Sequence, residues 1–354
     1  MATSKVPTGS AEVLAGATFV GCSEQNASGN RTGAKATPRK VMVGGSRIKT
    51  VDMHAHCAFP EMAAMLGMEL MTEYQVSGAD RLHDMDAQGI DVAALSINAF
   101  WYGADRDVSA ELIRKQNEKL AELCAAQPDR FVAFATIALQ HPDLAVEQID
   151  YGVKKLGLRG VSIGTNVDGV ELSDPKFHPV WEKIEELSCP LFMHPFGGTP
   201  ELRHRLKGNG GLNNVIAQPL ETTIALSKLI MEGTLDRYPG LKVCTCHGGG
   251  FLPFYPPRLD AMLTTFPERQ RVTLRKKPSE YLKDMYHDSM VFTSEALEYL
   301  VSIVGPERVY LGTDYPFKWA PAAVDMILNT PGLSDDDRRA ILGGTAARLL
   351  GIAD

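Results

Sequence analysis

Short apolar segments rich in β-branched residues alternate with longer segments of helical periodicity along most of this 354-residue chain. Strands that alternate with helices in this way form a parallel sheet. An open, doubly wound sheet would need a glycine-rich phosphate loop after the first strand, but that strand ends in His54-Ala55-His56. Eight strand–helix units fit a closed barrel instead. We therefore expect an α/β fold, a (β/α)8 TIM barrel, with strands at 50–53, 92–97, 131–136, 160–163, 190–194, 242–246, 290–293 and 309–312.

The segments between the predicted strands have the hydrophobic spacing of amphipathic helices. Ser109 and Ser334 precede two of these segments and are expected to be N-caps, the second followed by an acidic first turn. The expected helices are 110–126, 144–156, 176–187, 220–233, 295–304, 320–328 and 335–350.

Residues 1–45 differ from the rest because they are rich in Ala, Gly, Ser and Thr. We expect a partly irregular N-terminal extension there, followed by a barrel domain over residues 46–354. Gly44-Gly45 is expected to turn a β-hairpin at the junction. The apolar segment 13–22 is short and broken by glycines, so we expect a cytoplasmic protein, with export through a degenerate signal as the alternative.

The charge and the cysteines narrow the classes of partner. A net charge of −7 without a dense Lys/Arg stripe argues against nucleic acid and leaves a small molecule as the expected partner. No stretch is long enough to span a bilayer. The six cysteines are scattered without zinc-finger spacing, which is typical of reduced thiols inside a cell.

Four metal-ligand side chains stand at the ends of predicted strands. His54 and His56 are spaced i, i+2 at the end of the first strand and therefore point to the same side. His194 ends the fifth strand and Asp314 follows the eighth. Barrel active sites are built at the carboxyl ends of the strands, so these side chains are expected to meet. Three imidazoles and a carboxylate suit Zn²⁺, with Mn²⁺ or Fe²⁺ possible.

Two further residues are candidates for catalysis and substrate binding. His247 ends the sixth strand and is better placed as a general acid or base than as another ligand. The run Gly248–Gly250 would let the backbone pass close to the metal centre. Arg258 could pair with a substrate carboxylate or form a structural salt bridge with Asp260 or a neighbour, and both interpretations stay open. The remaining histidines, expected in helices or loops at the surface or around the site, are His83, His141, His178, His204 and His287.

Several motifs together resemble the amidohydrolase-2 branch of the amidohydrolase superfamily, which includes aminocarboxymuconate semialdehyde, γ-resorcylate and 5-carboxyvanillate decarboxylases. The resemblance implies a barrel of the metal-dependent hydrolase type. It also implies one divalent metal on His54, His56, His194 and Asp314, with His247 as the acid/base. Arg258 would then bind the substrate carboxylate, and a homodimer is expected, in which an arginine sometimes crosses the interface. The matching motifs are VDMHAH (51–56), RGVSIGTNV (159–167), FMHPFGG (192–198), PLETTIAL (219–226), CHGGGFLPFYPPRLD (246–260) and LGTDYPF (311–317).

This chain departs from the family pattern at points that bear on the substrate. Phe196 stands where the semialdehyde decarboxylase has tryptophan, and the fourth strand lacks the lysine that would bridge a second metal. The loop 57–80 has no basic residue to bind a second carboxylate. An insertion before Pro219 adds Arg203, His204, Arg205 and Lys207, either as a replacement anion site or as a solvated face.

The expected activity is non-oxidative decarboxylation of a small unsaturated or aromatic carboxylic acid, with Asp314 and His247 as catalytic residues and Phe196 and Arg258 in contact with substrate. One alternative is a metal-dependent hydrolase of a lactone, amide or C–C bond, because one barrel supports many chemistries. Another is an O2-activating non-haem metal oxygenase on the same barrel.

Overall fold

The computed structural model describes residues 18–20, 38–69, 75–319 and 322–353. Most of the predicted extension, including residues 13–17 and 21–22 of the apolar segment, lies outside these residues. Within them, β1 (Thr18–Val20) pairs in parallel with β5 (Gln75–Ser77). No helix in the described ranges is long and apolar enough to cross a membrane.

The main sheet is a closed parallel barrel, as predicted. Two sheets, ordered β4-β6-β7 and β15-β14-β13-β12-β9-β8, meet at two seams. At one seam only Phe134 separates β7 from β8. At the other seam the Asp314 amide donates to the His54 carbonyl at 2.8 Å. The strands are β4 (Val51–His56), β6 (Val92–Ser96), β7 (Phe131–Ala133), β8 (Ala135–Thr136), β9 (Val161–Ile163), β12 (Pro190–Met193), β13 (Lys242–Thr245), β14 (Tyr286–Asp288) and β15 (Val309–Tyr310).

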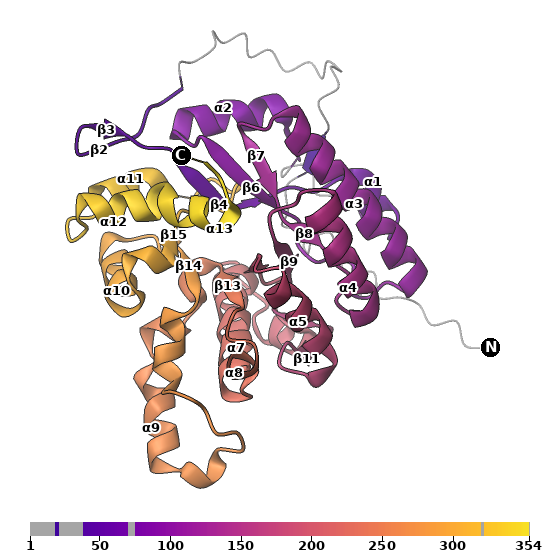
Figure 1. Ribbon diagram of the computed structural model, residues 1–354, viewed down its shortest axis with the longest axis vertical. Coiled ribbons are helices and arrows are strands. Elements are labelled where there is room, and N and C mark those ends of the chain that lie inside the picture. Colours follow the sequence, from indigo (N-terminus) through magenta and orange to yellow (C-terminus); the bar gives the residue numbers. More distant parts are fainter. Residues whose placement is uncertain (1–17, 21–37, 70–74, 320–321, 354) are drawn as a thin grey trace.

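Helices surround this barrel, and the C-terminal helices lie near β4, where the first barrel strand meets the segment after β15 (Figure 1). The larger ones are α2 (Gly78–Gln88), α3 (Arg106–Ala126), α4 (Pro142–Ile149), α5 (His178–Glu186), α7 (Gln218–Met231), α9 (Pro257–Thr265), α10 (Ser294–Val304) and α11 (Ala323–Asn329). Shorter elements are α1 (Pro60–Ala64), α6 (Pro200–Arg205), α8 (Thr234–Arg237), α12 (Asp335–Arg339), α13 (Thr345–Leu350), β2 (Met42–Val43), β3 (Ser46–Arg47), β10 (Asn166–Val167) and β11 (Val170–Glu171).

The local expectations have mixed outcomes. The hairpin forms, with β2 and β3 antiparallel and Gly44 and Gly45 at positive φ. Ser334 caps α12 by accepting from the Asp337 amide, while the Asp337 side chain accepts from the Ser334 amide. The prediction for Ser109 is wrong: α3 begins a turn earlier, where Asp105 accepts from the Val108 amide, and Ser109 is buried inside the helix.

The seventh strand is also misplaced by the sequence pattern. Residues 290–293 are apolar and β-branched, but the strand is β14, Tyr286–Asp288, which pairs with β13 and β15. His287 therefore lies buried in a strand rather than in a helix or loop. It can be buried because its Nδ1 lies 3.0 Å from Thr245 Oγ1 and its Nε2 lies 3.2 Å from the Leu282 carbonyl. A polar strand whose partners come from distant segments has no period-2 apolar pattern.

The barrel interior is filled below the mouth by side chains from most strands. Phe134 and Phe192 stack there at 4.9 Å, together with Val51 and Met53 of β4. Ala55, by contrast, packs in the outer cluster, and a register irregularity lies between Asp52 and Ala55. Such bulges re-aim side chains near active sites. In β4, Val51 and Met53 point into the barrel interior. This bulge turns His54 and His56 toward the mouth.

Candidate active site

Four predicted ligands meet at the mouth of the barrel. His54 and His56 end β4, His194 directly follows β12, and Asp314 follows β15. All four are buried, and one ligand atom from each lies within 4.8 Å of the others. His54 Nε2 and His56 Nε2 are 3.1 Å apart. Asp314 Oδ1 lies 3.2 Å from the first nitrogen and 3.0 Å from the second.

These distances suit a shared cation. Two ligand atoms that each lie about 2.1 Å from one ion, at right angles, are roughly 3 Å apart. Both ring nitrogens of His194 are buried and have no hydrogen-bond partner among the residues described. Burial and the neighbouring histidines hold the pKa of His194 well below its ordinary value, so its imidazole is neutral. Neutral imidazole is the form that binds a metal, so the four residues fit a divalent ion.

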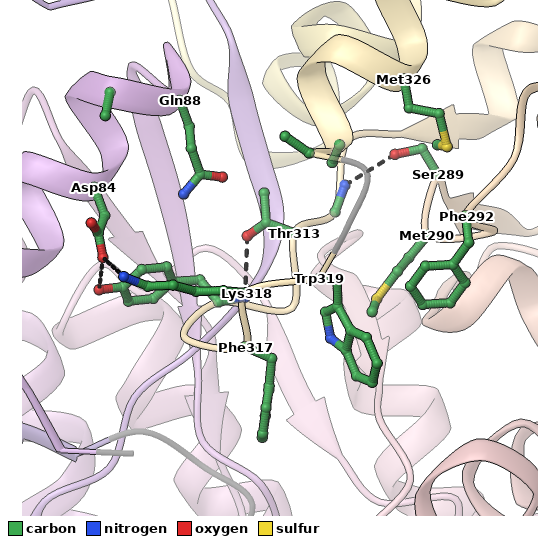
Figure 2. A pocket seen from close by; sticks show the side chains of 15 residues that line it. Asp84, Gln88, Ser289, Met290, Phe292, Thr313, Phe317, Lys318, Trp319 and Met326 are labelled. Atoms are coloured by element: carbon green, nitrogen blue, oxygen red, sulfur yellow. Dashed lines mark hydrogen bonds and ion pairs between the residues drawn. The ribbon is translucent and has the colours of Figure 1, made fainter. Parts of the chain in front are cut away.

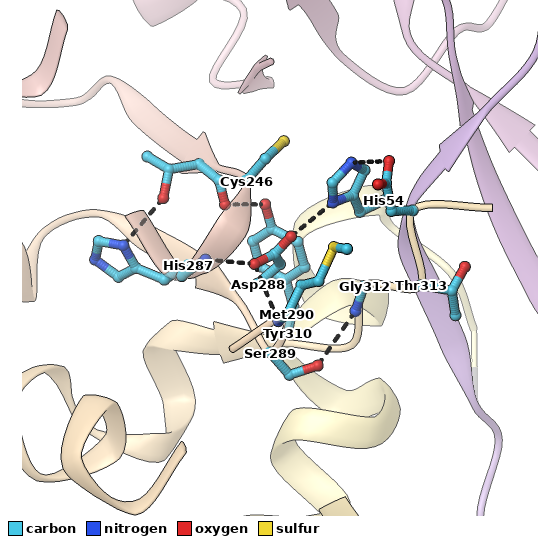
Figure 3. A network of polar contacts seen from close by, with 12 residues as sticks. His54, Cys246, His287, Asp288, Ser289, Met290, Tyr310, Gly312 and Thr313 are labelled. Carbon is cyan, nitrogen blue, oxygen red and sulfur yellow. Dashed lines mark hydrogen bonds and ion pairs between the residues drawn. The ribbon is translucent and has the colours of Figure 1, made fainter. Parts of the chain in front are cut away.

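Asp288 is a functional residue that the sequence reasoning missed. Figure 3 shows its buried carboxylate between His54 and the glycine-rich loop. Asp288 Oδ2 lies 2.6 Å from His54 Nδ1, and Oδ1 accepts from the Gly248 amide at 2.7 Å. A carboxylate on the far nitrogen fixes the tautomer and the orientation of a ligand histidine. The signal was the polar pair His287-Asp288 in a buried strand, which the misplaced seventh strand obscured.

A second group of possible ligands consists of His54, Cys246 and Asp288. Burial raises the pKa of the Cys246 thiol to about 12. The thiolate is the form that binds metal, so this sulfur is a poor ligand at neutral pH. His54 Nδ1 and Asp288 already face each other in a short contact. We interpret this group as support for His54 rather than as a second metal site.

His56 and Asp314 each have a hydrogen-bond partner on the atom that faces away from the other ligands. His56 Nδ1 lies 3.0 Å from Ser96 Oγ. The Trp319 indole N–H donates to Asp314 Oδ2 at 2.9 Å, which leaves Oδ1 facing the histidines. Burial alone would raise the pKa of Asp314, but the charge of His54 and hydrogen bonds from His54 and His56 hold it well below the ordinary value. Asp314 is therefore ionised, with one carboxylate oxygen already occupied.

Trp319 also lines a small cavity of ≈ 250 Å³ (Figure 2). Thr313 and Tyr315 flank Asp314 and line the same cavity. The Thr313 hydroxyl donates to Asp52 at 2.6 Å, and Lys318 forms an ion pair with Asp84 at 3.5 Å. These contacts hold the segment that presents Asp314.

His247 lies beside the ligands on the loop that follows β13. Its ring centroid is 5.3 Å from that of His54 and 5.2 Å from that of His194. Its Nδ1 is buried and finds no hydrogen-bond partner in the described part of the chain. Burial and the nearby charge of His54 lower the pKa of His247 to about 4. The imidazole is therefore neutral at pH 7 and can accept a proton.

The glycines after His247 are required by close backbone approach. A Cβ on Gly249 would lie 2.6 Å from His287 Nδ1, and one on Gly250 would lie 2.3 Å from the Pro219 carbonyl. Both glycines have positive φ, at 81° and 69°. This run therefore packs the loop tightly against His287 and Pro219, and the expected close approach of its backbone to the metal centre stays a prediction.

The two predicted substrate contacts lie in different places. Phe196, two residues after His194, lines a cavity of ≈ 620 Å³. Arg258 is exposed on α9, which projects from the barrel (Figure 1), and its guanidinium lies 6.0 Å from the Tyr255 ring. The alternative salt bridge with Asp260 is wrong, because the Asp260 carboxylate accepts from the amide and hydroxyl of Ser279. A role for Arg258 in substrate binding stays a prediction.

Comparisons with known proteins agree with this geometry. The sequence pattern of the amidohydrolase family matches residues 51–352. The chain is 30% identical over 275 residues to 2-amino-3-carboxymuconate-6-semialdehyde decarboxylase of Dictyostelium discoideum, which covers 77% of this chain and 76% of that protein.

Solved structures give the same result. The crystal structure of 5-carboxyvanillate decarboxylase from Sphingomonas paucimobilis superposes with a TM-score of 0.80 at 28% identity, over 86% of this chain and 100% of that one. A dihydroxybenzoic acid decarboxylase from Polaromonas, solved with bound manganese and the inhibitor 2-nitroresorcinol, gives 0.77 at 26% identity, over 86% and 97%. With its barrel, its strand-end histidines and these relatives, the chain belongs to the amidohydrolase family.

Proposed function

We propose that this protein is a metal-dependent, non-oxidative carboxy-lyase that releases CO2 from an aromatic or otherwise unsaturated carboxylic acid. The observation that carries the proposal is a neutral His247 imidazole, whose Nδ1 has no partner among the described residues, beside a cluster of four possible metal-ligand side chains. Its named relatives are decarboxylases of such acids.

His54, His56, His194 and Asp314 are the proposed ligands, and a divalent ion held there would polarise an oxygen of the substrate. In the reaction the bond between the ring carbon and the carboxylate breaks, and its electron pair stays on that carbon. CO2 leaves, and the carbon gains one proton. His247 starts as the neutral base, takes a proton from a substrate hydroxyl or from water, and delivers it to the carbon.

Asp314 contributes as a charged ligand in this scheme rather than as the proton donor. Its Oδ2 accepts the Trp319 indole N–H, and its Oδ1 faces His54 and His56. The two catalytic residues therefore have separate roles, because Asp314 fixes charge at the ligand cluster and His247 moves the proton.

Zinc is the metal that we propose, because three imidazoles and one carboxylate suit it. Manganese, which the Polaromonas relative holds, is the main competitor, since ligand type alone does not select between them. Elemental analysis of enzyme purified without added metal, followed by stripping and reloading with each ion, decides between them.

We also propose a homodimer in which α9 contributes to the interface. Tyr255, Met262 and Phe266 are exposed apolar side chains on or beside this projecting helix, and Arg258 stands among them. In this arrangement Arg258 reaches the substrate of the partner subunit. Mixing two inactive variants, Arg258→Ala and His247→Ala, should restore activity if the arginine acts across the interface. A monomer by light scattering, or no restoration after subunit exchange, would refute it.

The reaction itself is tested by incubating the metal-loaded enzyme with hydroxybenzoates and unsaturated dicarboxylates. We expect stoichiometric CO2 without O2 consumption. Solvent ¹⁸O in a product carboxylate would indicate a hydrolase, and O2 uptake would indicate an oxygenase.

A further inference from the structure

The larger cavity at the mouth has two chemically different parts. It is built by the segments that follow three strands, β6, β9 and β12, and one of its lining residues, Phe196, lies two residues after His194 in the chain. Aromatic side chains line one part of it, and polar side chains line the other. At ≈ 620 Å³ it is large enough for a substituted benzoate.

The aromatic part is formed by segments that are close in the chain to two of the proposed ligands. Phe100 and Phe196 line the cavity and pack against Ala58 and Ala63, which follow His56 closely in the chain. Tyr102 is fixed in the wall, because its hydroxyl accepts from the Gly164 amide at 3.0 Å. An aromatic ring that enters the cavity would contact the side chains of Phe100 and Phe196.

Arg203 supplies the cation in the polar part. It extends from α6, and its Nε donates to the Gly198 carbonyl at 2.6 Å, while Nη2 lies 3.3 Å from the Phe196 carbonyl. These partners orient the guanidinium without neutralising it. Within the described ranges, no carboxylate lies at ion-pair distance from Arg203, and the side chain is half-buried. A guanidinium has five N–H groups, so donors remain for a ligand.

The neighbouring acids do not cancel this charge directly. Both Glu221 oxygens are occupied: Oε1 accepts from the Thr199 amide and Oε2 from the Asn166 side chain, each at 3.1 Å. Asp168 and Glu201 also line the cavity, but both are exposed. Arg203 therefore offers a fixed positive charge at the far end of an aromatic-lined space.

We propose that Arg203 binds a second carboxylate of the substrate, so that the enzyme acts on aromatic acids with two carboxylate groups. This inference rests on the proposed function, because one carboxylate is lost beside His247 and the other is retained at Arg203. It also accounts for the loop 57–80, which has no basic residue to take that role. Arginine suits this role because its planar fork matches a carboxylate.

The test compares two ligands that differ by one carboxylate: salicylate and 4-hydroxyisophthalate. Their dissociation constants are measured by calorimetry on the metal-loaded enzyme and on Arg203→Ala, with Arg205→Ala as the matched control. Arg205 lies on the same helix but is exposed and does not line the cavity. We expect the wild type to prefer the dicarboxylate by roughly 10- to 100-fold, as for a hydrogen-bonded charge.

Arg203→Ala should abolish this preference while leaving salicylate binding and metal content unchanged, and Arg205→Ala should keep the preference. A preference that survives in Arg203→Ala, or a variant that loses both ligands equally, would overturn the proposal. CO2 release is measured on the same preparations. An Arg203-dependent preference without CO2 release would refute the proposed reaction and leave the anion site standing; CO2 release without the preference would do the reverse.

Discussion

The two sides of the barrel mouth differ in how their histidines are held. On the side of β4, β14 and β15, His54 is backed by Asp288 and His56 by Ser96, and Asp314 is backed by Trp319. On the side of β12 and β13, the ring nitrogens of His194 and Nδ1 of His247 have no protein partner within the described ranges. The first side fixes geometry before any ligand arrives, and the second offers free nitrogens.

This difference separates two roles that the same residue type performs. Ligands with an outer partner are preorganised, so metal binding on that side costs little reordering. A histidine that carries a proton must instead change its hydrogen-bond partner during the reaction. A ring nitrogen held by a buried carboxylate could not make that change. On this basis we propose that the β4–β15 side mainly retains the metal and that the β13 side transfers the proton.

The largest effect is expected when a proposed metal ligand on the β4–β15 side is replaced. His54→Ala or Asp314→Ala should lose bound metal and activity together, because each removes one of four converging ligand atoms. Elemental analysis and CO2 release on the same sample check this. Full metal content in either variant would remove that residue from the ligand set.

Replacing His247, on the β12–β13 side, should separate the loss of activity from the loss of metal. His247→Ala should lose roughly 10²- to 10⁴-fold in kcat, as for a general acid–base group, while metal content stays at the wild-type level. The measurement is again metal per chain and the rate of CO2 release. Loss of metal in this variant would show that His247 is a ligand and that the contrast between the two sides is wrong.

A smaller effect is expected when the support behind His54 is weakened. Asp288→Asn retains the shape but removes the charge that orients His54 and the Gly248 amide. Metal affinity should fall about 10- to 100-fold, as for other outer partners of ligand histidines. A chelator-competition titration measures this affinity. An unchanged affinity would mean that Asp288 is not needed to hold His54.

The smallest effect is expected at Trp319, whose side chain is 38% exposed. Trp319→Phe removes the N–H that binds Asp314 but keeps a ring beside Phe292, 5.4 Å away. Metal affinity should fall less than tenfold, because solvent can replace a hydrogen bond at a half-exposed site. The other two tryptophans, Trp101 and Trp181, are buried, so a change in fluorescence on metal binding should vanish in this variant. A fluorescence change that persists would contradict this contact.

Much of the architecture could be predicted from local patterns. Each of the apolar strands that end in a histidine or aspartate predicts a position in the barrel, and the polar residue at its end predicts a side chain at the mouth. The barrel and the convergence of His54, His56, His194 and Asp314 could therefore be anticipated. Asp288 could not, because its strand is polar and its carboxylate is buried against partners at residues 54 and 248, far away in the sequence. Sequence spacing carries no information about those contacts before the fold is known.

The substrate-binding residues were harder to predict from the sequence for the same physical reason. Arg203 and Arg205 are equivalent in sequence, two basic residues in one insertion. Only the carbonyls of Gly198 and Phe196 distinguish them, by turning Arg203 into the cavity. Arg258 shows the converse: a motif matched its position, yet the helix that carries it projects from the barrel.

The most direct test of the central claim follows the fate of the substrate carbon in D2O. Metal-loaded enzyme is incubated with 4-hydroxyisophthalate and other hydroxylated aromatic acids, and CO2, bound metal and product deuterium are measured on one sample. We predict one CO2 and one deuterium at the vacated carbon per product, only while metal is bound. Product that carries no solvent deuterium, or turnover that survives removal of the metal, would contradict the proposed reaction.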